Sequence, residues 1–187
     1  MKKLYLGVSG KMGSGKTTLT DGIIGALSSL KIERVSLAKP IKDMQNLIYD
    51  YLGTEIEGEK DRDLLIALGM WGRGKHPDFW LNTYLEKIKN IDADIIICDD
   101  VRFLNEATWF KENGLLMRIE GVQRGPNVDV SRATDETETA LDNFDFEYYI
   151  NNSDSMETSL MSALYTIAQH INIGDSLMEK LAGGTSG

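Results

Sequence analysis

The 187-residue sequence has few of the side chains that form crosslinks. It contains one cysteine, Cys98, and two histidines, His76 and His170. A single cysteine excludes an internal disulfide and fits the reducing conditions of the cytosol. A tetrahedral zinc site needs four ligands, and one cysteine with two histidines far apart in the sequence cannot supply them. An apolar core must therefore hold the fold, and a hydrophobic content of 42% is sufficient for one.

Long apolar runs and basic charge are scarce as well. No stretch approaches the ~18 apolar residues that a membrane-spanning helix needs. The 20 basic side chains are outnumbered by 29 acidic ones, which gives a formal net charge of −9. Binding of nucleic acid depends on neutralising many phosphates, so this balance argues against it. We therefore expect a cytoplasmic protein with small-molecule partners and without nucleic acid or membrane as a partner. A small anion could still bind where Lys and Arg gather in one cleft.

Short apolar segments alternate with segments of helical periodicity. Strands are expected at residues 4–8, 34–37, 94–99, 115–119 and 147–150. Helices are expected at residues 16–30, 40–52, 61–71, 77–88, 107–113 and 156–171. This alternation predicts a parallel sheet with helices on both faces, in which ligands bind at the carboxyl ends of the strands.

The alternation covers most of the chain and indicates a single domain over residues 1–175. A long polar segment at about residues 121–135 interrupts it, with glycines, a proline and the arginines Arg124 and Arg132. Long polar loops inside compact domains are usually functional or disordered, so we expect a mobile lid there. The two arginines could close over a transferring phosphoryl group, although a solvated loop with scattered charges is the plain alternative. The Gly/Ser-rich end, residues 176–187, is expected to be a flexible tail.

One motif carries strong chemical information. Residues 10–17 read Gly-Lys-Met-Gly-Ser-Gly-Lys-Thr, which fits the phosphate-binding P-loop pattern between a predicted strand and a predicted helix. Glycines let backbone N–H groups converge on phosphate oxygens, Lys16 would reach the β- and γ-phosphates of ATP, and the Thr17 hydroxyl would bind Mg²⁺. A turn that merely connects strand to helix is the alternative, but the pattern rarely arises by chance. The motif and the sheet together predict a three-layer α/β/α P-loop NTPase fold with a central five-stranded parallel sheet.

The residues expected to bind ATP lie in this motif and after the last strand. They are Gly10, Lys11, Gly13, Ser14, Gly15, Lys16, Thr17, Thr18 and Asn151. Asn151 and Asn152 follow the last predicted strand, where the edge of an adenine could lie. A plain turn at these two asparagines is equally compatible with the sequence.

The most apolar predicted strand ends in two acids, and an arginine follows them. Asp99 and Asp100 could hold the water shell of Mg²⁺ or orient an attacking oxygen, and they could also be solvated acids or a helix cap. Arg102 comes directly afterwards, and its planar fork suits a phosphate. The alternative for Arg102 is a surface ion pair with one of these acids.

Further segments match the order of motifs in one family. They are Leu-Ala-Lys-Pro-Ile-Lys at 37–42, Leu-Gly-Met-Trp-Gly-Arg at 68–73, His-Pro-Asp-Phe-Trp at 76–80, Asp-Val-Arg-Phe-Leu-Asn-Glu at 100–106, Thr-Glu-Thr-Ala-Leu-Asp at 137–142 and Tyr-Ile-Asn-Asn at 149–152. With the P-loop, these segments resemble the phage deoxynucleoside monophosphate kinases of the nucleoside monophosphate kinase-like P-loop group. Lys39 stands where that family has an acid, and Asp135-Glu136 stand where a His is common.

The resemblance implies Mg²⁺-dependent transfer of the γ-phosphate of ATP to a deoxynucleoside monophosphate, in the host cytoplasm if the protein is phage-encoded. It also implies a closing lid and a homodimer, although no apolar stripe identifies an interface. The catalytic residues would be Lys16, Arg102, Arg124 and Arg132. The acceptor would contact Lys42, Trp71, Arg73, Trp80, Asp100, Arg102 and Glu138, and the metal would be bound by Thr17, Asp99 and Asp100.

Plain structural roles remain open for several of these residues. Trp71, Phe79 and Trp80 could stack on a base, but aromatic residues on helices more often belong to a core. Lys42 and Arg73 could be surface charges at helix ends. Glu138 could complete a helix-capping box with Asp135.

Two other functions remain open at this stage. A kinase of the same group could act on phosphomevalonate or dephospho-coenzyme A, whose recognition needs no base-stacking pocket formed by the tryptophans. A nucleotide-dependent switch without an acceptor would leave the arginines of residues 121–135 without a purpose.

Overall fold

The computed structural model describes residues 3–58, 60–121, 136–152 and 155–171. The chain divides into two compact units. Unit 1 is formed by the chain before Val35 and after Ile91, and unit 2 is formed by Val35–Ile91. The expectation of a single domain over residues 1–175 stays a prediction. No helix within the described ranges is long and apolar enough to cross a membrane.

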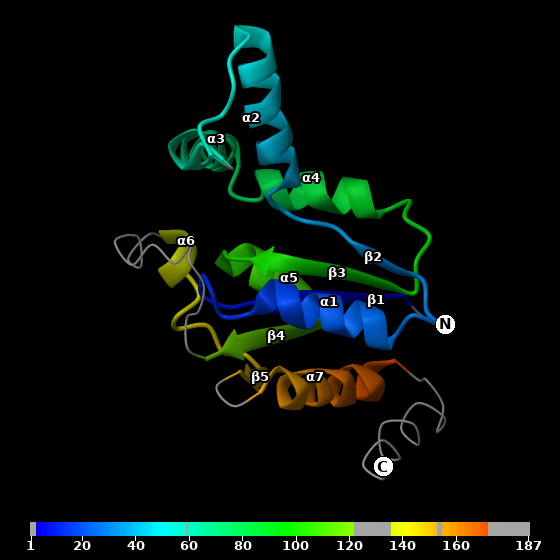
Figure 1. Ribbon diagram of the computed structural model, residues 1–187. Coiled ribbons are helices and arrows are strands. Elements are labelled where there is room, and N and C mark those ends of the chain that lie inside the picture. Colours follow the sequence, from blue (N-terminus) through cyan, green and yellow to red (C-terminus); the bar gives the residue numbers. More distant parts are fainter. Residues whose placement is uncertain (1–2, 59, 122–135, 153–154, 172–187) are drawn as a thin grey trace. The chain divides into compact units, whose positions relative to one another are not determined.

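Unit 1 is built around one parallel sheet. Its strands are β1 (Leu4–Ser9), β2 (Ile32–Arg34), β3 (Ile95–Val101), β4 (Leu115–Glu120) and β5 (Tyr148–Asn151). They lie in the order β2-β3-β1-β4-β5, and each neighbouring pair is parallel (Figure 1). The five-stranded parallel sheet predicted from the sequence is confirmed. Because β1 lies between β3 and β4, the segments that follow these three strands meet at one edge of the sheet.

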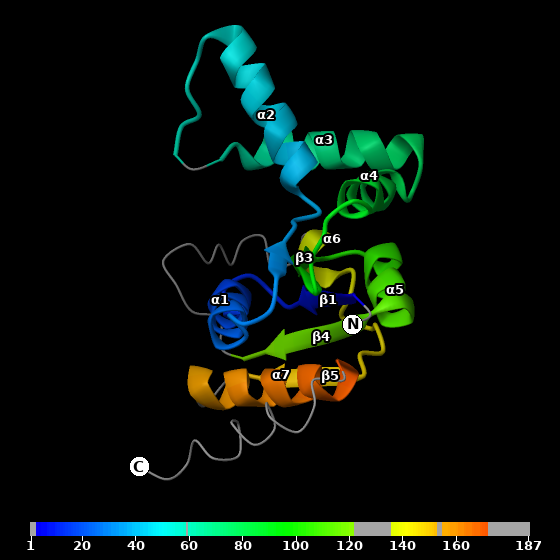
Figure 2. The same cartoon turned by 90° about the vertical axis from the view of Figure 1, so that its right-hand side faces the viewer.

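The two faces of β1 pack against different helices. Leu4, Leu6 and Val8 belong to a core that also contains side chains of α1 (Lys16–Ala26) and α7 (Met156–His170). On the opposite face, the ring of Tyr5 lies 5.2 Å from that of Trp109 in α5 (Leu104–Asn113). Figures 1 and 2 show α1 and α5 on opposite sides of the sheet. The alternation of side chains along a strand thus produces the three layers.

The expected second strand is shifted along the chain. The sequence predicted it at residues 34–37, whereas β2 covers Ile32–Arg34. Val35 and Leu37 are buried, but they belong to unit 2 and lead toward its first helix. Their apolar character therefore reflects burial outside a strand ladder. The first helix is also shorter than expected, because α1 ends at Ala26 instead of residue 30.

Unit 2 consists of three helices, α2 (Lys39–Leu52), α3 (Arg62–Lys75) and α4 (Phe79–Ile88). Gly53 ends α2 with a φ of 64°, a left-handed conformation that favours glycine. The carboxylate of Asp61 caps α3 by accepting from the Leu64 N–H at 3.0 Å, and it also accepts from the Tyr49 hydroxyl at 2.8 Å. Asp61 therefore joins the start of α3 to α2.

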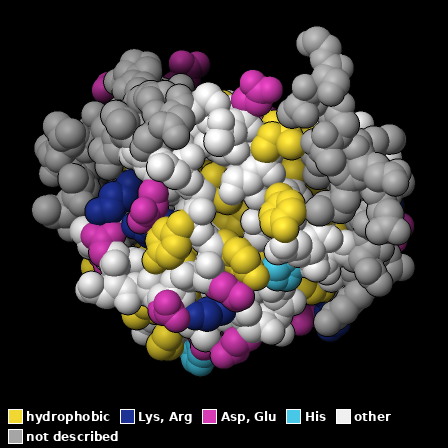
Figure 3. Space-filling model, turned by 90° about the horizontal axis from the view of Figure 1, so that it is seen from below, with side chains coloured by type: hydrophobic (Ala, Val, Ile, Leu, Met, Phe, Trp, Pro, Cys, Tyr) yellow, Lys and Arg dark blue, Asp and Glu magenta, His cyan; other side chains and the backbone are white. Residues whose placement is uncertain are grey.

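Unit 1 exposes several large apolar side chains. Met161 and Tyr165 lie four residues apart on α7 and are 40% and 53% exposed, and Tyr149 of β5 is 52% exposed. Figure 3 shows hydrophobic side chains gathered among charged ones on the face seen from below. The homodimer implied by the resemblance is not tested by this exposure and stays a prediction.

The contact between β1 and α5 gives a prediction for stability. A Cβ atom built on Gly7 would lie 2.6 Å from Cγ of Phe110, whereas one built on Gly25 of α1 meets nothing within 4 Å. We expect Gly7→Ala to lower the free energy of unfolding by about 1–3 kcal/mol through overpacking. Gly25→Ala, the matched control, should raise it by up to about 0.5–1 kcal/mol. Urea unfolding of both variants checks this, and equal effects would contradict the close approach.

Candidate active site

The P-loop lies between β1 and α1 at the carboxyl edge of the unit 1 sheet. Gly13 and Gly15 adopt φ values of 74° and 92°, which side chains other than glycine rarely tolerate. Gly15 is the N-cap of α1. The loop therefore points backbone N–H groups and a positive helix end at the space in front of it, as phosphate binding requires. Thr17 and Thr18 are exposed in the first turn of α1.

Asn152 supports the back of the P-loop. Its Nδ2 donates to the carbonyl of Ser14 at 2.9 Å and occupies the place where a side chain on Gly15 would stand. Its Oδ1 accepts from the Ser159 hydroxyl of α7 at 3.2 Å. In a trans peptide the carbonyl and the following N–H point in opposite directions, so this bond also orients the N–H of Gly15. The adenine contact expected at Asn151 is untested and stays a prediction.

Lys16 is held inside its own loop. Its Nζ donates to the carbonyls of Gly10 at 2.6 Å and Lys11 at 2.7 Å. Burial, and next the positive charge of Arg102, lower the pKa of Lys16 from 10.5 to about 8, against the opposing charges of Glu138 and Asp99. Lys16 is therefore a cation at neutral pH in a place where positive charge is already concentrated.

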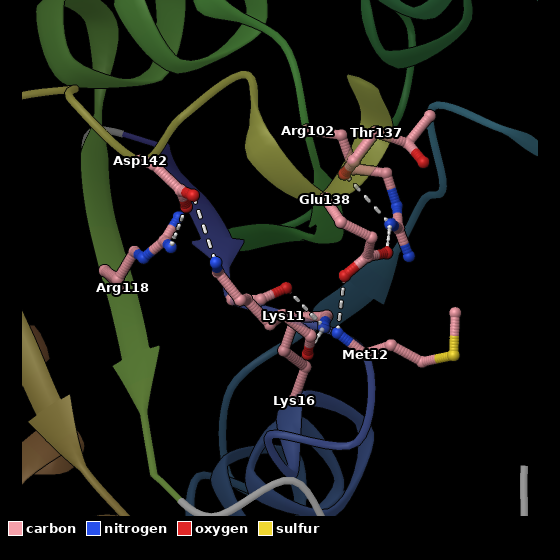
Figure 4. Close-up of polar contacts among 9 residues, drawn as sticks. Lys11, Met12, Lys16, Arg102, Arg118, Thr137, Glu138 and Asp142 are labelled. Atoms are coloured by element: carbon pink, nitrogen blue, oxygen red, sulfur yellow. Dashed lines mark hydrogen bonds and ion pairs between the residues drawn. The ribbon is translucent and has the colours of Figure 1, made fainter. Parts of the chain in front are cut away.

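Glu138 lies between the P-loop and Arg102 (Figure 4). It belongs to the short helix α6 (Glu136–Thr139) and is only 8% exposed. Its Oε2 accepts from the backbone N–H of Met12 at 2.7 Å, and its Oε1 forms an ion pair with Nη1 of Arg102. The same Nη1 donates to the carbonyl of Thr137 at 3.2 Å. Asp135, the other member of the expected capping box, lies outside the described residues.

A second carboxylate, Asp142, likewise contacts both a P-loop residue and an arginine. It accepts from Nζ of Lys11 at 3.0 Å and from Nη2 of Arg118 at 3.2 Å (Figure 4). Arg118 is buried, and its guanidinium lies 5.2 Å from the ring centre of Phe146. The sequence analysis assigned neither Arg118 nor Asp142 to the site. The sequence did contain a signal for Arg118, because it is a charged residue inside an otherwise apolar predicted strand.

The two expected acids lie within β3, which runs to Val101 instead of ending at residue 99, and they have different partners. Asp99 is buried and paired with Arg34, which also donates to Asp21 of α1 at 2.9 Å. Asp100 accepts from the Cys98 thiol at 3.1 Å, and burial raises the pKa of that thiol well above its usual value. The sequence analysis did not assign Arg34. Asp99 is therefore paired with a protein cation.

No group of three or more acidic, His or Cys side chains within the described part of the chain could hold a metal by itself. Mg²⁺ commonly takes one or two protein oxygens and completes its shell with water and substrate phosphates. The three expected metal ligands, Thr17, Asp99 and Asp100, stay a prediction.

The backbone that carries Arg102 is fixed separately. The buried carboxylate of Glu106 accepts from the N–H of Arg102 at 2.8 Å and from that of Phe103 at 3.1 Å. These bonds satisfy N–H groups at the start of α5, where a helix lacks internal partners. The turn after β3 therefore presents Arg102 from a well-anchored position.

The remaining expected acceptor residues lie in unit 2. Lys42 is exposed on α2, and Arg73 is in the last turn of α3. Trp71 is 49% exposed and contacts Phe79 edge-to-face, with ring centres 5.6 Å apart. Trp80 is only 4% exposed, and its indole N–H donates to the carbonyl of Gly69 at 2.9 Å, so its ring belongs to the packing of unit 2. The assignment of these four residues to one acceptor site stays a prediction.

Arg124 and Arg132 lie outside the described residues, as does the expected lid beyond Gly121. Their assignment to catalysis also stays a prediction.

More than half of the chain matches a known protein family. A family model described as phosphomevalonate kinase matches residues 8–115, more than half of the chain, including the P-loop and Arg102. No curated protein matches the sequence.

Among solved structures, TT1252 from Thermus thermophilus is similar at 15% identity and a TM-score of 0.55, over 91% of this chain and 99% of that one. A gluconokinase from Sinorhizobium meliloti 1021 is similar at 13% identity and a TM-score of 0.53, over 98% of both chains. A shikimate kinase from Aquifex aeolicus vf5 is similar at 12% identity and a TM-score of 0.50, over 91% of this chain and all of that one. At such identities these likenesses show the fold, and they confirm the predicted P-loop architecture.

The lowered pKa of Lys16 predicts proton uptake when a polyphosphate binds. Between pH 8 and 10 the free site holds a partly neutral Lys16, and a bound polyanion favours the charged form. At pH 8.5, where the phosphates of ATP are already fully ionised, we expect ATP binding to take up a fraction of a proton at Lys16. Calorimetry in two buffers of different ionisation enthalpy measures this, with Lys16→Met as the control that should abolish uptake. Buffer-independent heats at pH 8.5 would contradict the assignment.

Proposed function

Because the chain belongs to the phosphomevalonate kinase family, we propose that it transfers the γ-phosphoryl group of ATP to the phosphate of a small metabolite of the phosphomevalonate type. The observation that carries the proposal is the joint placement of Lys16 and Arg102. The two cations lie near enough for Arg102 to lower the pKa of Lys16, and Glu138 connects Arg102 to the P-loop. One cation serves the donor phosphates, and the other serves an acceptor phosphate.

The donor side follows from the P-loop. Its backbone N–H groups and Lys16 bind the phosphates of ATP, and Asn152 supports the loop from behind. A Mg²⁺ ion held by Thr17 and Asp100 would neutralise charge on the phosphates. Asp99, paired with Arg34, keeps the end of β3 in place beside α1.

The acceptor side needs cations and no strong base. A phosphate acceptor is already ionised near neutral pH, so the protein contributes positioning and positive charge. Arg102 is suited to this role because a guanidinium can bind two phosphate oxygens at once. Arg118 and Lys11 add positive charge at the same edge, moderated by Asp142.

A deoxynucleoside monophosphate is the second candidate acceptor. One observation favours it: half of Trp71 is exposed, which leaves a ring for a base to contact. Burial of Trp80 favours the first candidate, because one of the two rings expected to stack on a base is used in packing. Both candidates use the same donor site.

A substrate panel tests the proposal. We expect ADP to form from ATP and Mg²⁺ when phosphomevalonate is added, and Lys16→Ala to remove nearly all turnover while the protein stays folded. Dephospho-coenzyme A and the deoxynucleoside monophosphates complete the panel, with ADP measured by a coupled assay. Turnover with deoxynucleoside monophosphates alone would establish the second candidate instead. ADP formation at the same rate without any acceptor would indicate a nucleotide-dependent switch.

Arg102 separates acceptor binding from donor binding. A charge-assisted hydrogen bond contributes roughly 1.5–3 kcal/mol, so Arg102→Ala should weaken acceptor binding about ten- to a hundredfold. Arg102→Lys should recover part of this loss, because a point charge cannot reproduce the fork. ATP affinity should change little. Separate calorimetric titrations measure the two affinities, with Lys111→Ala on the outside of α5 as a surface control. Loss of ATP binding would place Arg102 in the donor site.

A further inference from the structure

Two carboxylates in and after α6 bind two consecutive residues of the P-loop. Glu138 holds the backbone N–H of Met12, and Asp142, four residues later, holds the side chain of Lys11. Each carboxylate also holds one arginine of a neighbouring strand end, Arg102 after β3 for Glu138 and Arg118 in β4 for Asp142. Figure 4 shows both sets of contacts, those of Glu138 and those of Asp142.

The surroundings of Glu138 are unusual for a carboxylate beside phosphate-binding groups. It is almost fully buried, and a buried charge is destabilising unless it is paired and hydrogen-bonded. Both of its oxygens are engaged, Oε1 by Arg102 and Oε2 by Met12. A negative group so placed would repel a substrate phosphate, so direct binding of the acceptor is a poor explanation for it.

Arg102 is anchored at both ends. Glu106 accepts from its backbone N–H, and Glu138 pairs with its guanidinium. Among the described residues, the contacts of this guanidinium to Glu138 and Thr137 use Nη1. A guanidinium carries five N–H donors in a rigid plane, so fixing Nη1 also fixes the direction of the opposite edge of the fork.

We propose that Glu138 is a positioning residue, which sets the distance and orientation of Arg102 relative to the P-loop and so aligns the acceptor phosphate with the γ-phosphate. The inference rests on the proposed function, and it replaces the acceptor contact expected for Glu138. Asp142 connects a different pair of groups, Lys11 and Arg118, and acts independently of Arg102. Phosphoryl transfer depends on in-line placement, so an error at Arg102 reduces the rate as well as acceptor affinity.

The test is a double-mutant cycle between Glu138 and Arg102. Glu138→Gln keeps an oxygen for the Met12 N–H but loses the ion pair. We expect it to lower kcat with the acceptor roughly ten- to a hundredfold, as misplacement of a reacting group does, with little change in KM for ATP. In an Arg102→Ala background the same substitution should have no further effect on kcat. Contacting residues that act as a unit show such non-additivity.

Two other substitutions serve as controls. Glu136→Gln makes the same chemical change at an exposed position of α6 and should leave kcat unchanged. Asp142→Asn should add its own effect in the wild-type and Arg102→Ala backgrounds alike. Thermal unfolding of each variant shows whether it is folded, and Glu138→Asp, which keeps the charge, takes the place of Glu138→Gln if that variant unfolds. Equal effects of the Glu138 change with and without Arg102 would overturn the proposal.

A binding measurement separates this inference from the proposed function. Inorganic phosphate carries the one group that any phosphorylated acceptor presents, and ³¹P NMR can follow its binding to the four members of the cycle. If the wild type phosphorylates no acceptor, the proposed function has failed, and the cycle is then judged on phosphate affinity alone. Weakening by Glu138→Gln only when Arg102 is present supports the positioning role. An equal change in phosphate affinity with and without Arg102, or no change in either background, would overturn it.

Discussion

Parallel pairing of β1 with β3 on one side and β4 on the other is the constraint on which the site depends. Residues 9, 101 and 118 stand next to one another in this register, since Ser9 pairs with both Val101 and Arg118. The P-loop follows Ser9, and Arg102 follows Val101. Three segments that are far apart in the sequence therefore deliver their charged groups to one edge. An antiparallel neighbour would have sent one of them to the opposite end of the sheet.

Cations outnumber carboxylates among the described groups at this edge. Asp142 pairs with Lys11 and Arg118, Glu138 pairs with Arg102, and Asp99 pairs with Arg34, whereas Lys16 donates to two backbone carbonyls. The chain as a whole is acidic, with a formal net charge of −9. A local excess of cations can be maintained in such a protein because each cation has a fixed position and a carboxylate close by. Bound phosphates would then compete with these carboxylates for the cations instead of entering a pocket of unpaired positive charge.

The sequence predicted the parts of this protein that depend on local pattern. The sheet, the P-loop, the end of α2 at Gly53 and the placement of Arg102 directly after β3 follow from periodicity and from residue types at fixed spacing. The partners of these groups could not be predicted, because they depend on contacts between distant residues. Glu138 and Met12 are 126 positions apart, and Asn152 and Ser14 are 138 apart.

Val35 and Leu37 also show that a local pattern does not specify tertiary contacts. An apolar alternation indicates burial without specifying a strand, and these two residues are buried although β2 ends before them, at Arg34. Arg118 is the opposite case, since a charge in an apolar strand was visible in the sequence. The role of Arg118 could not be predicted, because its partners Asp142 and the ring of Phe146 come more than twenty residues later in the sequence.

The bond between Asn152 and the P-loop has a consequence for how the protein acquires its site during synthesis. Residues 8–115 contain the P-loop and Arg102, yet Glu138, Asp142, Asn152 and Ser159 are all made later. A nascent chain that has emerged only as far as β4 carries the phosphate-binding sequence without the groups that hold it in shape. Contacts of such long sequence separation also form late in folding, because closing a long loop is entropically unfavourable. Competence to bind phosphate thus marks the completion of the fold.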